Sequence, residues 1–264
     1  MIEILQLFIL GIGVGCFGAL VGIGGGLIMV PLFVLAMMPP NGTTFSNVQQ
    51  VIGTSLFGVL LNAVSGTYAY LKQGRVFFKA AIPFALATVP GAFIGGYISA
   101  YFSGPGFSIT FGITLVALGL FMYFKSSSKR ANAMADQFDA SMLTQRQMVL
   151  GVSLSFLVGF ISSILGIGGG VIHVPLMIFI LGFPAHIAVA TSTFVLMVSS
   201  SIGVVSHALL NHIVWTPALC IGLGAIVGAQ IGAKISQKSR PKIIVTILAF
   251  TMVVLGIQLV VRGL

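Results

Sequence analysis

Two glycine-rich runs are the features of this sequence that could do chemistry. The first contains Gly22, Gly24, Gly25 and Gly26, and the second contains Gly166, Gly168, Gly169 and Gly170. Each run interrupts an apolar stretch, and a helix that restarts after such a break has amides without internal partners and a positive dipole end. Backbone amides with no side chain above them form a cradle for an anion. The alternative is close helix packing through small residues, although packing motifs space their glycines four apart and do not cluster them.

Hydroxyl, amide and imidazole groups follow each run and could complete the hydrogen bonds of a bound oxyanion. A pair recurs as Thr54-Ser55 and Thr191-Ser192, and Asn62 and Ser199 occupy equivalent positions further along. His173, three residues after the second run, could donate to an anion or couple protons to transport by titrating. The structural alternatives are bonds from Thr and Ser to the preceding helical turn, and a histidine satisfied by a neighbouring carbonyl.

The acidic residues exclude most other chemistries. Glu3, Asp136 and Asp139 are the three acids of the chain, so no carboxylate lies in an apolar stretch for a proton relay, a metal site or general acid–base catalysis. Neither glycine run continues into the Gly-Lys-Ser/Thr of a nucleotide-binding loop, and no Gly-x-Ser-x-Gly elbow of a serine hydrolase occurs. We therefore expect a protein that is not an enzyme and that uses no cofactor.

The remaining histidines show no metal-binding spacing. His207 and His212 lie near a loop and are expected at the membrane interface, and His186 starts a helix on the basic side. No His-x-x-x-His pair shares a predicted helix, so no metal site is expected.

The composition places these residues in a membrane protein. Of the 264 residues, 58% are hydrophobic and 6% are charged, and the mean hydropathy is +1.16. A helix that crosses the hydrocarbon core needs about 20 apolar residues, so the stretches 27–38 and 171–183 are too short to span comfortably. The predicted apolar stretches are 4–21, 27–38, 48–71, 77–101, 106–124, 148–165, 171–183, 187–210, 214–235 and 243–261. We expect an all-α, polytopic helical membrane protein with the lipid bilayer as a partner.

The sequence is internally duplicated. From Thr54 onward the halves align at a constant offset of 137 residues, and the glycine runs align at an offset of 144, so the first half carries seven extra residues around 37–47. The duplication divides the chain into a first repeat, 1–124, a polar cytoplasmic linker, 125–147, and a second repeat, 148–264. The matching blocks are Thr54-Ser55-x-Phe57 with Thr191-Ser192-x-Phe194, Gly91-Ala92-x-Ile94-Gly95 with Gly228-Ala229-x-Ile231-Gly232, and Thr114-x-Val116 with Thr251-x-Val253.

The basic residues orient the chain in the membrane. The net charge of +9 would suggest nucleic acid for a soluble protein, but the Lys and Arg residues lie in short loops, so no nucleic acid is expected. If each broken element crosses an even number of times, eleven basic residues fall on one side and Arg262 falls on the other. A single crossing of each broken element would give eight against four. The positive-inside rule favours the first arrangement, which makes the repeats inverted, each with a glycine-broken helical hairpin plus about three spans, and places both termini outside.

The repeated Gly-x-Gly-Gly-Gly-x(4)-Pro-Leu block, the Thr-Ser pair and the Gly-Ala-x-x-Gly block resemble the TauE/SafE family, also called the sulfite exporter or 4-toluene sulfonate uptake permease family. The resemblance covers residues 10–260. It implies a secondary transporter of small sulfur-containing anions, such as sulfite, sulfonates or sulfoacetate, in a bacterial-type inner membrane. The second repeat departs from the family pattern at Asn211-His212-Ile213, where a glycine is usual, whereas Gly74-Arg75-Val76 in the first repeat fits it.

Taken together, the sequence predicts a transporter in which two half-helix ends face a midplane cavity and hold a small anion by backbone amides. Alternating access by rocking one half against the other is the expected mechanism, with both termini in the periplasm. An anion channel that uses the same dipoles for selectivity is the alternative, and a membrane enzyme is less favoured. The exact substrate, the direction of transport, the coupling ion and whether the chain forms a homodimer are left open.

Overall fold

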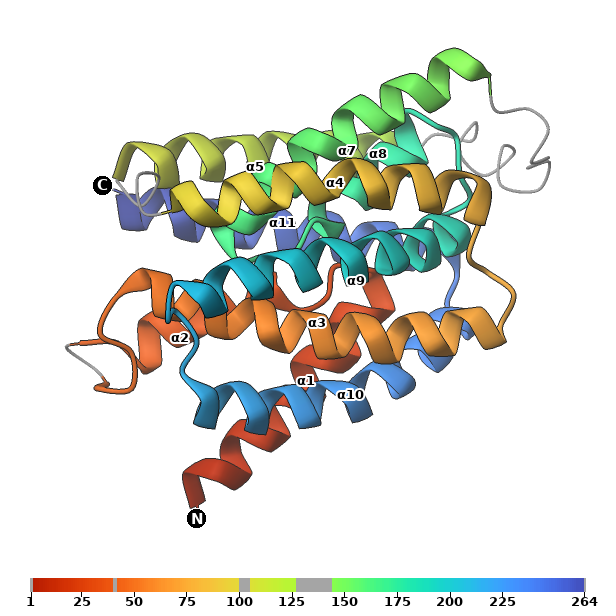
Figure 1. Cartoon of the computed structure of the whole chain (residues 1–264). Helices are drawn as coiled ribbons and strands as arrows, with labels where there is room; N and C mark the ends of the chain where they lie inside the picture. The colour runs from red at the N-terminus through yellow and green to blue at the C-terminus, as the bar shows by residue number, and fades with distance from the viewer. Residues whose placement is uncertain (1, 40–41, 100–104, 127–143, 264) are drawn as a thin grey trace.

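The computed structural model describes residues 2–39, 42–99, 105–126 and 144–263, and the described residues are helices joined by loops, with no strand among them (Figure 1). An all-helical fold is what the apolar stretches predict, and this prediction is confirmed. The helices are α1 (Ile2–Val21), α2 (Gly26–Ala36), α3 (Val48–Lys72), α4 (Phe78–Ile98), α5 (Pro105–Ser126), α7 (Gln145–Leu165), α8 (Gly170–Phe179), α9 (Ala185–Leu209), α10 (Trp215–Lys238) and α11 (Pro241–Gly263).

Seven helices in the described part of the chain are long and apolar enough to cross a membrane. The helices α2 and α8, with 11 and 10 residues, do not reach that length, as the sequence predicts for the stretches after the glycine runs. At about 1.5 Å per residue, each covers roughly half of a 30 Å hydrocarbon core. The chain is therefore a multi-pass membrane protein in which two elements are too short to span alone.

Each short helix turns back beside the helix that precedes it. α1 ends at Val21, the chain reverses through the glycine run, and α2 returns toward the end of the molecule where α1 began (Figure 1). α7 and α8 follow the same path from the opposite end (Figure 1). The central helices α3 and α9, which follow the two hairpins, lie against each other and run in opposite directions (Figure 1).

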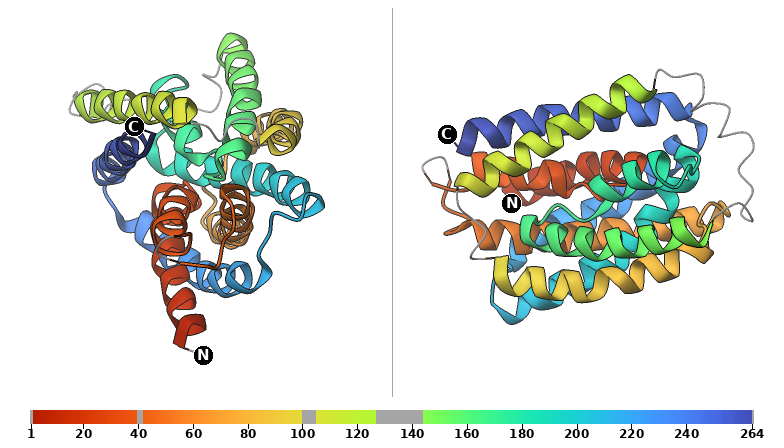
Figure 2. Two further views of the ribbon diagram at one scale, coloured as in Figure 1. Left: turned by 90° about the vertical axis from the view of Figure 1, so that its left-hand side faces the viewer. Right: turned by 90° about the horizontal axis from the view of Figure 1, so that it is seen from above.

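Most of the helices form two groups, and each group contains one helix from the other sequence repeat. α10, from the second repeat, packs most extensively against α1 and α3, whereas α4, from the first repeat, packs against α7 and α9. We call α1, α2, α3 and α10 the first bundle, and α4, α7, α8 and α9 the second bundle. They meet along α3 and α9, and α5 and α11 form a separate pair along one side (Figure 2). Structural units and sequence repeats are therefore different sets of helices.

The recurring Gly-Ala-x-x-Gly block makes the closest helix contacts within each bundle. A Cβ atom at Gly228 of α10 would lie 2.2 Å from the carbonyl oxygen of Ile12 in α1, and one at Gly91 of α4 would lie 2.1 Å from that of Phe156 in α7. Such approach of two backbones requires residues without side chains, because lipid provides no hydrophobic force that would press bulkier helices together.

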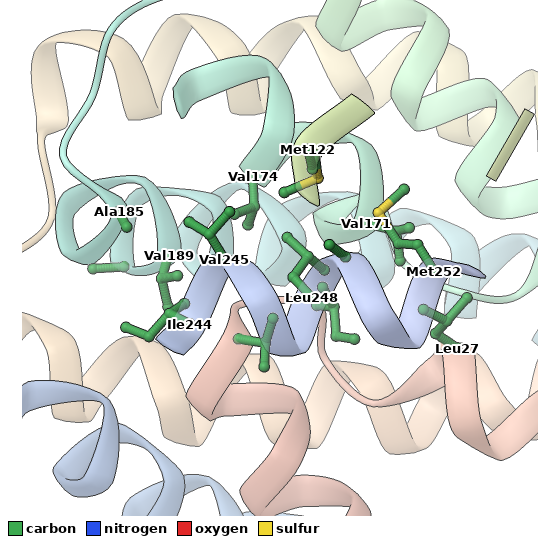
Figure 3. Packing of buried hydrophobic residues seen from close by; sticks show 14 of the residues in the cluster. Leu27, Met122, Val171, Val174, Ala185, Val189, Ile244, Val245, Leu248 and Met252 are labelled. Atoms are coloured by element: carbon green, nitrogen blue, oxygen red, sulfur yellow. The ribbon is translucent and has the colours of Figure 1, made fainter. Parts of the chain in front are cut away.

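The pair α5–α11 is held to the bundles by apolar packing. Leu248 and Val245 of α11 lie close to Val174 of α8, and Met252 lies near Leu27 of α2 (Figure 3). These side chains belong to the largest buried cluster of the described residues, which includes Leu27 of α2 and Val171 and Val174 of α8. Both short helices thus take part in the packing that joins the pair to the bundles.

Basic residues gather at one end of the helices. The helix ends and connections that carry them lie together, and both chain termini point toward the other end (Figure 1). The described basic residues of this group are Lys72, Arg75, Lys79, Arg146, Lys234, Lys238, Arg240 and Lys242.

We predict that Gly228→Val destabilises the protein, because its Cβ would collide with the Ile12 carbonyl and force α1 and α10 apart. Overpacking of this kind costs about 1–3 kcal/mol. Gly13→Val in α1 is the matched control, since no atom lies within 4 Å of a Cβ there. Thermal unfolding in detergent measures both variants, and an equal melting temperature for the two would contradict the packing assignment.

Candidate functional site

Both glycine runs adopt backbone conformations that other residues avoid. Gly22, Gly24 and Gly25 have φ angles of 81°, 74° and 82°, and Gly166 and Gly168 have φ angles of 67° and 73°. These left-handed values cost L-residues roughly 1–2 kcal/mol each, which explains why glycine occupies these positions. The sequence predicts a break in each helix, and the positive φ angles are how the chain reverses into α2 and α8.

The two breaks lie against each other at the centre of the molecule. A Cβ at Gly26 would lie 2.6 Å from the carbonyl oxygen of Ile167, and one at Gly170 would lie 2.2 Å from that of Gly22. Each run therefore packs on the backbone of the other, and the eight predicted glycines of the two runs come together in one place.

One pair of apolar side chains lies against both breaks in this conformation. Val59 of α3 and Leu196 of α9 are equivalent in the two repeats and are fully buried. A Cβ at Gly24 or at Gly168 would meet both, at 2.5 Å and 2.6 Å from Leu196 methyl carbons and at 2.9 Å and 2.8 Å from Val59 Cγ1. We call Val59 and Leu196 the central plug. With the plug in place, the space between the breaks is closed.

The serines of the two Thr-Ser pairs hold the breaks of the opposite repeat. The Ser55 hydroxyl donates to the Gly166 carbonyl oxygen at 3.0 Å, and the Ser192 hydroxyl donates to the Gly22 carbonyl oxygen at 3.2 Å. Each serine hydroxyl has a single proton, and that proton is engaged in the bond to the carbonyl oxygen. In this conformation both serines therefore position the breaks and do not donate to a ligand.

The threonines of the same pairs hold the connections that follow α3 and α9. The backbone amide of Val214 donates to Thr54 Oγ1 at 3.0 Å, and that of Phe77 donates to Thr191 Oγ1 at 3.1 Å. Each threonine hydroxyl accepts in these bonds and retains its own proton. Each Thr-Ser pair thus links its own helix to one break and to one connecting loop, and none of these four bonds runs to the preceding turn of the same helix.

Several backbone amides of the breaks find no acceptor within the described chain. In the first run the amides of Gly22, Ile23 and Gly24 all point to the Gly18 carbonyl oxygen, at 2.9–3.2 Å. Those of Gly25, Gly26 and Leu27 have no such partner, and neither do those from Ile167 to Val171 in the second run. Buried amides are rarely left unpaired in proteins, so these groups are the donors of the candidate site. Gly22 and Gly24 contribute their conformation instead.

Asn62 and Ser199 are both buried near the central plug. The Asn62 side-chain amide donates to the carbonyl oxygens of Gly15 at 2.7 Å and Ala225 at 3.4 Å, which ties α3 to α1 and α10. Its Oδ1 atom is buried and has no partner among the described residues. The Asn62 side-chain nitrogen therefore ties helices together, and the side-chain oxygen is left as a free acceptor. Because an acceptor oxygen repels an anion, this atom does not donate to one.

His173 is fully buried in α8 and pairs with Ser155 of α7. Ser155 Oγ donates to the Gly151 carbonyl at 2.7 Å, so it accepts from His173 Nε2 at 3.0 Å. His173 Nδ1 is therefore the unprotonated nitrogen of a neutral ring, and it has no partner in the described structure. The ring is thus held by a hydroxyl group of the neighbouring helix α7.

Two pairs of polar side chains near the site are seen in the structure but were not predicted as pairs from the sequence. Tyr70 and Arg75 lie at the α3–α4 connection, and His207 and His212 lie at the α9–α10 connection. His207 is fully buried within the protein, because its ring reaches back to the Ser163 carbonyl, and its position at the membrane interface stays a prediction. The sequence repeat could have identified these pairs as equivalent, because the offset of 137 residues aligns Tyr70 with His207 and Arg75 with His212.

The departure at Asn211 leaves the backbone unchanged. Asn211 has a φ angle of 55°, and Gly74, its equivalent in the first repeat, has a φ angle of 65°. Asparagine is one of the few residues that enter the left-handed region readily. The two connections therefore have the same turn despite their different residues.

The sequence from residue 7 to residue 259 matches the family described as sulfite exporter TauE/SafE. The chain belongs to the TauE/SafE family. One relative of this TauE/SafE protein is YunE of Bacillus subtilis, which is named a probable membrane transporter protein. The two sequences are 34% identical over 98% of this chain and 97% of the length of YunE. One from Methanocaldococcus jannaschii is 28% identical over 95% of this chain and 93% of its own. No solved structure matches the chain.

These findings agree with the membrane character of the TauE/SafE protein and with the transport class that the sequence predicts. Within the described residues, no group of three or more His, Cys, Asp or Glu side chains is placed to hold a metal ion. The donors gathered at the centre are backbone amides and neutral side chains.

We predict that Gly25→Ala destabilises the TauE/SafE protein more than Gly169→Ala does, although the two glycines occupy equivalent places in the sequence. Gly25 has a φ angle of 82°, and its Cβ would lie 3.0 Å from the Val14 carbonyl oxygen. Gly169 has a φ angle of −62°, and its Cβ would meet a Val158 methyl group at 2.8 Å. The left-handed position adds about 1–2 kcal/mol. Chemical unfolding in detergent measures the difference, and the reverse order would refute these backbone assignments.

Proposed function

We propose that this protein is a secondary transporter of a small sulfur-containing anion of the sulfite, sulfonate or sulfoacetate type. The observation that carries the proposal is the pair of opposed breaks whose amides, Gly25 to Leu27 and Ile167 to Val171, lack acceptors within the described chain. Breaks in corresponding positions of two repeats are where transporters of this architecture bind substrate. The family's description as a sulfite exporter supports the class of anion.

The charge of the site comes from backbone dipoles. Each helix that starts at a break carries roughly half a positive charge at its N-terminus, so two such ends offset about one negative charge. No Lys or Arg occurs in α2 or α8. A sulfonate presents three acceptor oxygens in a fixed trigonal arrangement, which suits donors that converge from two sides.

Access to the site requires the central plug to part. Because α10 belongs to the first bundle and α4 to the second, the moving units proposed here are the two bundles and not the sequence halves. Sliding or rocking along α3 and α9 would separate Val59 from Leu196 and open the breaks to one face at a time. The hydrogen bonds from Ser55 to Gly166 and from Ser192 to Gly22, which join the two bundles, would then break, whereas the bonds of Thr54 and Thr191 lie within one bundle each and would be kept.

The proposed orientation follows from the charges. The end that carries the basic residues faces the cytoplasm, and both termini face the periplasm across an inner membrane. With this orientation the repeats are inverted, which the opposite directions of α3 and α9 support.

An anion channel remains the second candidate, because the same dipoles would select for anions and the apolar plug would act as a hydrophobic gate. The full burial of Val59 and Leu196 favours a carrier, since the structure is closed at its centre. Counterflow separates the two: a carrier accelerates uptake of labelled anion when unlabelled anion is present inside, and a channel does not.

We predict that binding depends on the substrate's negative charge. A sulfonate should compete with sulfite for transport into proteoliposomes, and an uncharged sulfone or sulfonamide of the same shape should compete poorly. A hydrogen bond to a charged group contributes about 1.5–3 kcal/mol, so the loss should exceed tenfold. Inhibition constants measured side by side test this, and equal competition would point to an apolar pocket.

We predict that the connections at the two ends of the molecule differ in accessibility. In a background without Cys16 and Cys220, Ser239→Cys lies at the basic end and Thr44→Cys, in the α2–α3 loop, lies at the opposite end. An impermeant thiol reagent should label Thr44→Cys in sealed cells and Ser239→Cys only after permeabilisation. Labelling of both in sealed cells would exclude the proposed orientation.

A further inference from the structure

The two ends of the transporter carry equivalent polar pairs with different chemistry. The Tyr70 hydroxyl donates to the Ala19 carbonyl, and Arg75 lies over the Tyr70 ring, 5.0 Å from its centre. At the other end His207 Nε2 lies 3.3 Å from the Ser163 carbonyl, and His212 lies against His207. Ala19 and Ser163 are themselves equivalent in the two repeats. Equivalent backbone positions therefore hold a phenol and a guanidinium at one end of the protein and two imidazoles at the other.

Arg75 gives its end a permanent positive charge. Its guanidinium donates to Gln73 Oε1 at 2.7 Å, the His186 carbonyl at 3.0 Å and Ser236 Oγ at 3.3 Å, and it lies 3.1 Å from His186 Nδ1, the one titratable group among these partners. Burial lowers the pKa of Arg75, but a guanidinium stays protonated at any physiological pH. None of its recorded partners is a carboxylate, so this charge is uncompensated among the described residues.

The hydrogen bonds of the histidine pair define how many protons it holds. A carbonyl accepts, so His207 Nε2 carries a proton and, in the neutral ring, His207 Nδ1 is an acceptor. The partner atom at 3.2 Å, His212 Nδ1, is then the donor. His212 Nε2 remains a free basic nitrogen on a half-buried ring. One added proton at this atom leaves both bonds intact, whereas a second, on His207 Nδ1, would place two N–H groups face to face.

The surroundings of the pair are neutral. The recorded contacts are the Ser163 carbonyl from α7 and the backbone of Gly53 from α3, and neither group titrates. The titratable group that each of the two rings contacts is the other ring. Burial lowers the pKa of His212, so the ring is neutral at pH 7 and takes up its proton as the pH falls below the ordinary histidine range.

We propose that His207 and His212 together form a binding site for a single proton. The bound proton gives this end of the protein, the mouth at the α9–α10 connection, a positive charge like that of Arg75 at the other mouth. It also couples entry of the anion at this mouth to proton uptake. The coupling rests on the proposed anion transport, whereas the proton site does not. The loaded pair carries one positive charge, as Arg75 does, and an anion arriving at this face meets that charge when the proton is bound. Loss of the proton removes the attraction, so anion and proton enter together.

The proton count is tested on the purified protein in lipid nanodiscs. Imidazole ¹⁵N chemical shifts are followed from about pH 8 to about pH 4.5, a range that brackets the ordinary histidine pKa. The four histidines are assigned with single His→Gln variants. We expect His207 and His212 to gain one proton together, with His212 Nε2 as the acceptor. Two independent protons, or no proton on either ring over this range, would overturn the proposal.

The coupling is tested in proteoliposomes with labelled methanesulfonate, whose charge does not change over this range. The two faces are held at different pH, and the orientation is fixed by labelling Thr44→Cys. Acidifying the face with the histidine pair by about one pH unit should raise uptake up to about tenfold, as the protonated fraction rises, and acidifying the other face should not.

The double variant His207→Tyr/His212→Arg is the matched control, because it rebuilds the Tyr70–Arg75 pair at the second mouth. It should transport at a rate independent of the pH on that face. A double variant that keeps the wild-type pH profile would overturn the coupling. If no variant carries methanesulfonate, the proposed substrate class is wrong, and the imidazole titration still decides whether the proton site exists.

Discussion

Non-helical backbone inside a membrane must find partners within the protein, and the remaining structure depends on how this chain meets that requirement. Each glycine run exposes a carbonyl oxygen where its helix stops, at Gly22 and at Gly166. The serine that satisfies each carbonyl comes from the other repeat, Ser192 for the first and Ser55 for the second. Neither break is complete in a repeat that stands alone, so the duplication is a physical requirement of the fold and not merely its history.

The same reciprocity determines which parts can move as units. Glycines on α4 and α10 allow these helices to approach α7 and α1 so closely that each is fixed to the opposite repeat. The contact between the two bundles combines side chains along α3 and α9, with Val59 and Leu196 at its centre, and the backbones of the two breaks, which the serine hydrogen bonds also join. Relative motion of the bundles, as proposed, would therefore require the plug to repack and these contacts of the breaks to separate.

The sequence was sufficient for the helices, the breaks and the equivalence of the halves, because these depend on local apolarity and on residue types at fixed spacing. It predicted that Thr54-Ser55 and Thr191-Ser192 belong to the site, but it could not show that the serine protons are already engaged. That depends on which carbonyl lies opposite each hydroxyl, and the partner is more than 100 residues away in the chain. The exchange of α4 and α10 was likewise invisible, since a sequence repeat does not state which copy of a helix packs on which.

The histidines show the same limit in a different form. The sequence places His207 near the end of a helix, but it could not show that the ring lies against the Ser163 carbonyl and is completely buried within the protein. Applying the repeat offset to single polar residues, and not to blocks, would have paired it with the buried Tyr70. Divergent positions within an alignment of halves are thus as informative as matching ones.

Two halves with one backbone would give two faces of equal energy if their side chains were also equal. Three of the positions that break the equivalence place a titratable group in one or both repeats: Met29 stands against His173, Tyr70 against His207, and Arg75 against His212. A ligand or a proton shifts an equilibrium between two states only by its differential affinity for them. The breaks, as the proposed anion site, would be common to both states and would not by themselves favour one face. A preference between the faces would therefore arise from unequal residues such as these, which lie in α8 and at the two ends of the molecule.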